Sequence, residues 1–253
     1  MNRFFVKIAL ASLIGAVFML MAFYPYSHRM EVSGLEMNGL DYYFLCNGLL
    51  TDELSEGLEP PAFFALCVPL WLVVITAARY VTRILDGSLY HSLIRCHTKR
   101  AWFRTHLQRI CMPALVSFLF LQGFLLGFAF FDGMGLDSAY HQFYFGDSWR
   151  GAFALLLLGM ARKMLFLFPV IMMLLYLSAK RKRVVLPCII AFFLVIISMF
   201  LSIKTEFCPV YLLIHPSFPF VNLRMELFYV ISMLLLACFC LIHIRYSLKK
   251  LEF

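Results

Sequence analysis

The residues best able to support chemistry in this sequence are histidines, cysteines and charged groups in apolar surroundings. His91, His97 and His106 lie in a basic stretch, at a spacing that matches no compact metal site, and the neighbouring cations oppose a metal ion. The eight cysteines include no Cys-x-x-Cys pair, so we expect most of them to pack as small apolar groups. Cys46 and Cys208 are both predicted on the outer side, where a disulfide between them stays an open alternative.

Sequence motifs for phosphate binding and for catalysis are missing from the chain. No glycine is followed by lysine, which excludes the Gly-x-x-x-x-Gly-Lys-Ser/Thr loop that cradles nucleotide phosphates. His-Glu-x-x-His and Gly-x-Ser-x-Gly are also absent, and the acids of the first outer loop are scattered rather than paired for acid/base chemistry. We therefore expect no catalytic residue, no metal site and no cofactor on this chain, and we predict that it is not an enzyme.

Arg162 and Lys163 stand out because they interrupt a long apolar segment, residues 151–178. A helix of that length reaches roughly 42 Å, which exceeds the hydrocarbon thickness of about 30 Å. The two cations are therefore predicted near the outer boundary, where long side chains can extend outward to water. Intramembrane cations also mark functional pathways. Arg162, Lys163, Tyr211 and His215 are accordingly our candidates for a substrate pathway.

The elements that must position these residues are membrane helices. The chain is 63% hydrophobic and 14% charged, whereas soluble domains are about half apolar and about a quarter charged. Six apolar segments are long enough, or nearly so, to cross the membrane as helices. They cover residues 4–24, 61–81, 110–131, 151–178, 184–203 and 226–246. We predict an all-α polytopic membrane protein in which residues 1–253 form a single transmembrane domain.

Positive charge orients the predicted spans. With both termini cytoplasmic, most of the 22 Lys and Arg residues fall on the inner side, and most of the 14 acids fall on the outer side or at outer span ends. This distribution obeys the positive-inside rule. The net charge of +8 is then explained by orientation and by contact with anionic lipids. We expect no nucleic-acid partner, because no recognition motif accompanies the charge.

Two predicted outer connections are unusually apolar. Residues 41–50, in the first outer loop, are apolar and aromatic enough to lie on the membrane surface. This loop is either a solvated connection or a gate over a pathway. The second connection, Glu206–Phe220, contains three prolines, which forbid one straight helix. We expect a bent, re-entrant-like outer element there, before the last span, as either an apolar cap or a functional element.

The stretch Arg79–Arg109 combines positive charge with an apolar stripe. Leu89 and Leu93 fall on one helical face, and Phe103 continues a similar stripe after residues 98–100, which we expect to form a turn. The pattern predicts a short amphipathic cytoplasmic helix between spans two and three, then a basic turn, then a helix that enters span three. The stretch either fixes topology at the membrane surface or forms a docking surface for a cytoplasmic partner.

This stretch resembles the corresponding connection in small ABC-2-type permeases. The residues that carry the resemblance are Asp86-Gly87-Ser88, Leu93-Ile94-Arg95, Lys99-Arg100 and Trp102-Phe103. These permeases are the separately encoded membrane subunits of bacterial ABC transporters for bacteriocins, lantibiotics and related peptides. The resemblance extends to six spans with both termini inside. The acidic first outer loop and the Arg162-Lys163 pair have no counterpart in the family pattern.

The resemblance implies a permease in the plasma (inner) membrane of a bacterium, in contact with lipids and paired with a second copy or a paralogue. It implies ABC ATPase subunits on separate chains, which would bind the ATP, and a peptide or amphipathic, lipid-like substrate. The stretch would then act as a coupling helix. Its ATPase-docking residues would be Leu89, Leu93, Arg95, Lys99, Arg100, Trp102 and Phe103. Two alternatives stay open: a membrane-embedded enzyme acting on lipid carriers, and a non-transporting membrane assembly or immunity protein.

Overall fold

The protein is helical throughout the residues that the structure describes. In this computed structural model those residues are 3–32, 37–48, 59–87, 96, 98–132, 149–204 and 223–247, and they include no strand. The helices are α1 (Arg3–Val32), α2 (Gly39–Cys46), α4 (Pro60–Gly87), α6 (Lys99–Asp132), α8 (Trp149–Arg181), α9 (Val185–Lys204) and α10 (Leu223–Ser247). The predicted all-α fold is therefore confirmed. The cytoplasmic helix predicted around Leu89 and Leu93 and the outer element Glu206–Phe220 lie outside the described residues.

Five of these helices are long and apolar enough to cross a membrane. The crossing segments are Phe5–Tyr26, Pro60–Leu85, Lys99–Asp132, Gly159–Arg181 and Phe228–Ser247. The apolar stretch of α9, Val185–Leu201, is shorter than these. Length and composition thus support a multi-pass membrane protein with five candidate spans, and the sixth span stays a prediction.

The third predicted span begins at Lys99 rather than at residue 110. Thr98 caps this helix, because its Oγ1 accepts a hydrogen bond from the Ala101 amide at 3.1 Å and its carbonyl accepts one from the Trp102 amide at 3.0 Å. The predicted turn over residues 98–100 is wrong, since Lys99 already lies in the first helical turn and lysine favours helices. α6 is consequently one continuous helix of 34 residues.

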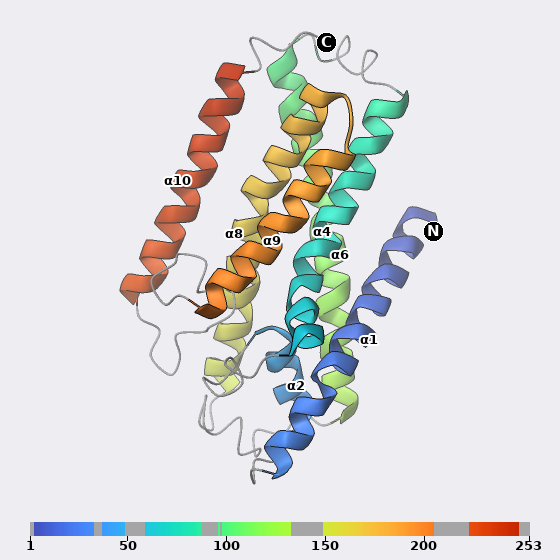
Figure 1. Ribbon diagram of the computed structural model, residues 1–253, viewed down its shortest axis with the longest axis vertical. Helices are drawn as coiled ribbons and strands as arrows, with labels where there is room; N and C mark the ends of the chain where they lie inside the picture. The colour runs from blue at the N-terminus through green and yellow to red at the C-terminus, as the bar shows by residue number, and fades with distance from the viewer. Residues whose placement is uncertain are drawn as a thin grey trace.

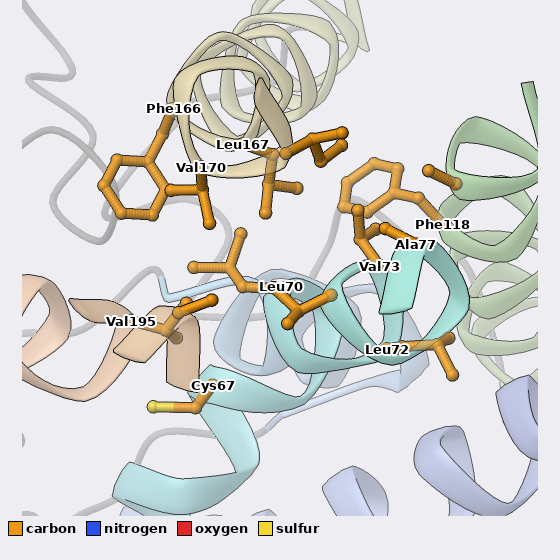
Figure 2. Packing of buried hydrophobic residues seen from close by; sticks show 14 of the residues in the cluster. Cys67, Leu70, Leu72, Val73, Ala77, Phe118, Phe166, Leu167, Val170 and Val195 are labelled. Carbon is orange, nitrogen blue, oxygen red and sulfur yellow. The ribbon is translucent and has the colours of Figure 1, made fainter. Parts of the chain in front are cut away.

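α4 is the central helix of the bundle. It contacts α1, α6, α8 and α9, and 67% of its apolar window is buried, against 22% for α1 and 28% for α10. Figure 2 shows Leu70 and Val73 of α4 packed among Leu167 of α8, Phe118 of α6 and Val195 of α9. α1 and α10 lie at the two sides of the bundle (Figure 1). The core that fixes the other elements is thus built around α4.

The long helices run alternately up and down, although α1 begins and α9 finishes nearer the middle of the bundle (Figure 1). At the end drawn uppermost, α4, α8 and α10 finish and α6 and α9 begin. We call it the basic end, because its exposed cations include Arg79, Arg83, Arg100, Arg104, Arg109, Lys180, Arg181, Lys182, Arg183 and Arg245. Their gathering at one end is the distribution that the positive-inside rule leads us to expect for the inner side.

Candidate functional site: a buried polar network at α2

α2 is a short helix inserted among the long ones, at the end of the bundle opposite the basic end (Figure 1). Asn38 begins it with a capping box. The Asn38 Oδ1 accepts hydrogen bonds from the Leu40 amide (3.0 Å) and the Asp41 amide (3.2 Å), and the Asp41 Oδ2 accepts one from the Asn38 amide (2.8 Å). Every residue of α2 except Tyr42 is buried. Its 8 residues are too few for an isolated helix in water, so packing must hold it in place.

The predicted position of residues 41–50 on the membrane surface is wrong for α2. The helix packs against α1 and α6, and its first residue, Gly39, is pressed against the end of α6. A Cβ atom at Gly39 would lie 2.5 Å from the carbonyl oxygen of Ala129 and 2.9 Å from the Cβ of Asp132. The segment is apolar because protein covers it, and composition alone cannot distinguish that burial from contact with lipid.

Tyr43, Gln122 and Asn47 form a closed ring of hydrogen bonds between α6 and the end of α2, and the backbone carbonyl of Tyr43 completes it. The Tyr43 hydroxyl donates to Gln122 Oε1 at 2.7 Å, and Gln122 Nε2 donates to Asn47 Oδ1 at 3.0 Å. The Asn47 Nδ2 then donates to the Tyr43 carbonyl at 3.0 Å. Tyr43 and Gln122 are both buried, so the ring satisfies polar groups that would otherwise be costly inside the bundle.

Lys163 of α8 joins this ring at the carboxyl-terminal end of α2. Its Nζ donates to both oxygens of Asn47, the carbonyl and Oδ1, each at 3.0 Å. Carbonyl groups at a helix end lack intrahelical partners and carry partial negative charge, which favours a nearby cation. The ammonium therefore links α8 to the end of α2, which the sequence analysis expected on the membrane surface.

Both cations of the Arg162-Lys163 pair are buried, with exposed fractions of 4% and 3%. The predicted outward extension of these side chains is therefore wrong. Instead of reaching outward, the Lys163 ammonium binds oxygen acceptors at the end of α2. Among the described residues no carboxylate pairs with Lys163, whose bonds go to the neutral oxygens of Asn47.

Arg162 lies beside a second polar contact that reaches α10. The Tyr229 hydroxyl donates to the Arg162 carbonyl at 2.8 Å, and Tyr229 is itself fully buried. The structure therefore brings Arg162 and Lys163, two of the four predicted pathway residues, into one buried polar region. The other two, Tyr211 and His215, lie outside the described residues.

The ionisable groups of α2 near Lys163 are held neutral. Burial raises the pKa of the Cys46 thiol to about 12, although the nearby Lys163 ammonium acts in the opposite direction. Burial also raises the pKa of the Tyr43 phenol well above its usual value, and Cys46 adds to that shift. Cys46 is a free, buried thiol, and Cys208, its possible disulfide partner, lies outside the described residues. Neither Cys46 nor Tyr43 thus supplies an anion for Lys163.

The predicted ATPase-docking residues separate into buried and exposed groups. Trp102 and Phe103 are buried, at 0% and 5% exposure, so they pack inside the chain. Trp102 lies against His106, with ring centroids 4.8 Å apart. The His106 ring also lies near that of Tyr80 of α4, with ring centroids 6.3 Å apart. Arg100 is exposed. Lys99 is half-buried. Leu89, Leu93 and Arg95 lie outside the described residues.

Sequence reasoning missed Tyr43, Asn47 and Gln122. Two signals were available: Asn38 with Asp41 three residues later is a capping-box pattern, and Gln122 is a polar residue deep within an apolar span. Neither signal gives the position of α2, because its contacts with α6 and α8 join residues far apart in the chain.

The described residues form an all-helical bundle, and its five long apolar helices are compatible with a multi-pass membrane protein. A polar network that contains a cation is buried near one end of this bundle. Comparisons with family models, with curated proteins and with solved structures find no match to the chain. The described residues also contain no group of three His, Cys, Asp or Glu side chains that could hold a metal ion.

Proposed function

We propose that this chain is the membrane-spanning permease subunit of an ABC transporter. In this proposal it moves a peptide or an amphipathic, lipid-like substrate across the plasma membrane of a bacterium, using ATP that a separate subunit hydrolyses. The six-span topology with both termini inside, and pairing with a second permease copy, belong to the same proposal. The resemblance of residues 86–103 to ABC-2-type permeases is its starting point.

The observation that best supports this function is the way the first turns of α6 are fastened to α4 at the basic end. ATP-driven movement of a separate ATPase must be passed to the spans through a stiff element. Trp102 is buried and contacts His106, which contacts Tyr80 of α4. A force applied to the exposed side of α6 near Arg100 and Arg104 would therefore reach two long helices together.

This arrangement changes which residues we propose for docking. Trp102 and Phe103 support the docking element from inside, because a buried ring offers no surface to a partner. Arg100 and Arg104 are exposed on the same two turns and are suited to an acidic surface on the ATPase. Exposed charges of this kind mainly set the rate and the specificity of association.

The test is co-purification of the tagged chain from its own membranes in an uncharged detergent, followed by mass spectrometry and an ATPase assay. We expect a polypeptide with a nucleotide-binding loop, and we expect Arg100→Glu with Arg104→Glu to lower its recovery by about tenfold or more. Arg245→Glu is the matched control, since Arg245 is exposed at the basic end but on α10. Equal recovery from both variants, or no such polypeptide from the unaltered chain, would contradict the proposal. An enzyme or an immunity protein predicts the second result.

A further inference from the structure

Lys163 has an electrostatic cost that its described contacts do not compensate. It is 3% exposed and lies within the span Gly159–Arg181, where a charged group is expensive unless it is paired. Both of its hydrogen bonds go to neutral oxygens, the carbonyl and Oδ1 of Asn47. Buried cations in membrane proteins face the bundle interior or a pathway and pair with other charges or with backbone carbonyls. Among the described residues, Lys163 has only the second kind of partner, the Asn47 carbonyl, together with the neutral Oδ1 of the same residue.

The geometry of the Lys163 contact resembles the binding of an anion. A carboxylate or a phosphate presents two oxygens to an ammonium, and Asn47 presents two oxygens at equal distances of 3.0 Å. Asn47 lies at the end of an inserted helix, and Gln122 hydrogen-bonds both to Asn47 and to Tyr43 of that helix. The end of α2 therefore occupies the position where an anionic group would satisfy Lys163 better.

We infer that Lys163 recognises an anionic group on the transported molecule, and that the Asn47 end of α2 fills this position when the molecule is absent. The ligand class is an amphipathic molecule with a carboxylate or a phosphate group. This inference rests on the proposed transport function. A hydrogen bond between two charged partners is stronger than one to a neutral oxygen, so such an anion would displace α2.

The other charged and titratable groups around Lys163 are compatible with this role. On α8 the neighbouring Arg162 adds positive charge to the region, and it is buried as well. On α2, Cys46 and Tyr43 are kept neutral by burial. Asp41 lies in the first turn of α2, about 9 Å along the helix axis from Asn47. On α6 the nearest described member of the network, Gln122, has no charge.

Cys46 provides a built-in reporter for displacement of α2, because it is fully buried next to Asn47. The experiment measures maleimide labelling of Cys46 by mass spectrometry at constant pH, on the full-length chain with any co-purified subunits in dodecyl maltoside. The probes are dodecyl phosphate and dodecanoate, compared with dodecyltrimethylammonium. We expect at least one anionic probe to speed labelling by about tenfold, a usual size for coupling between sites. The two anionic arms distinguish a phosphate from a carboxylate ligand, and the cationic probe should have no effect.

Two internal controls separate specific displacement from unfolding. Cys67, buried in the core of α4, must stay protected while Cys46 reacts. Lys163→Gln should abolish the response to the anion, whereas Lys180→Gln, at the exposed basic end of the same helix, should preserve it. If Lys163→Gln does not fold, Asn47→Ala carries the test: losing the competing Oδ1 should lower the half-maximal anion concentration by about fivefold.

Three results would overturn the inference: no anion effect on the unaltered chain, equal exposure of Cys67, or an unchanged response in Lys163→Gln. An unchanged half-maximal concentration in Asn47→Ala would also count against it. The outcome is separable from that of the proposed function. An anion response in a chain that co-purifies with no ATPase would keep the binding site and reject the ABC transporter.

Discussion

At the residue scale, Lys163 and Gly39 mark the two ends of α2 and are under opposite constraints. Burying the charge of Lys163 costs desolvation free energy, and its hydrogen-bond partners are neutral. Gly39 gives up a side chain so that the backbone of α2 can approach α6 at Ala129. Lys163 is therefore best tested by a substitution that separates its effect on stability from its effect on activity. Gly39 is best tested by adding one methyl group.

Lys163→Met should leave the protein as stable as before or more stable, although it should abolish any transport activity. Replacing buried charged groups by well-packed apolar side chains of similar volume is often neutral or stabilising by about 1–4 kcal/mol when no opposite charge is left unpaired. Among the described residues Lys163 has no carboxylate partner, and the substitution removes its bonds to the Asn47 carbonyl and Oδ1. Asn47 Oδ1 would still accept from Gln122 Nε2. Thermal unfolding in detergent measures the stability. A strong loss of stability would show that Lys163 is a structural residue.

Gly39→Ala should destabilise the protein by about 1–3 kcal/mol, the usual cost of overpacking. The new Cβ would meet the Ala129 backbone at 2.5 Å, and a backbone atom cannot move aside as a flexible side chain can. Gly123→Ala is the control, because nothing lies within 4 Å of its Cβ position. That change should be neutral or stabilise α6 by up to about 1 kcal/mol. Equal thermal shifts for the two variants would argue against the close contact.

Cys46 should resist alkylation well into alkaline solution. The reactive form of cysteine is the thiolate, and burial raises the Cys46 pKa from 9.0 to about 12. Three pKa units lower its thiolate fraction near pH 8 by about a thousandfold. Exposed Cys238 serves as the reference in the same labelling reaction. Similar labelling rates for Cys46 and Cys238 at pH 8 would mean that α2 is not buried.

At the element scale, α6 begins at a capped and anchored turn. Thr98 accepts a hydrogen bond from the Ala101 amide. Trp102 is buried against His106, which contacts Tyr80 of α4. The sequence pattern placed the helix start after residues 98–100, because these residues separate two apolar stripes and were expected to form a turn. Lysine and arginine are good helix formers. The helix therefore extends on the amino-terminal side of the apolar region as far as its cap, Thr98.

The two residues that fix the start of α6 should differ in the size of their effects. Thr98→Ala removes a cap and should cost about 1 kcal/mol, mostly as fraying of the first turn. Trp102→Ala removes a fully buried ring and should cost about 3–5 kcal/mol. Amide hydrogen exchange over residues 99–106, together with thermal unfolding, distinguishes the two. A Trp102→Ala variant as stable as Thr98→Ala would remove the support for a rigid docking element.

At the scale of the whole molecule, the sequence was sufficient to predict where the long helices lie along the chain. It was insufficient to predict which helices contact each other. Apolar segments of membrane length predicted α1, α4, α6, α8, α9 and α10, because backbone groups in lipid must be satisfied within a helix. The position of α2 could not be predicted in this way, since Tyr43, Asn47, Gln122 and Lys163 meet only through tertiary packing. The same lack of long-range information led to the wrong outward extension of Lys163.

The path of the chain predicts that α9 crosses the membrane and that both termini lie on one side. α8 ends at the basic end, and α10, after α9, ends there again (Figure 1). α9 has 20 residues, which span about 30 Å as a helix, close to the hydrocarbon thickness. Epitope tags at the two ends should therefore become accessible together, and only after permeabilisation of intact cells.

Lys182→Cys should behave like the tags, whereas Phe131→Cys, at the opposite end of α6, should react with an impermeant maleimide in intact cells. Tags on opposite sides would instead mean five crossings, with α9 lying inside the bundle without spanning it.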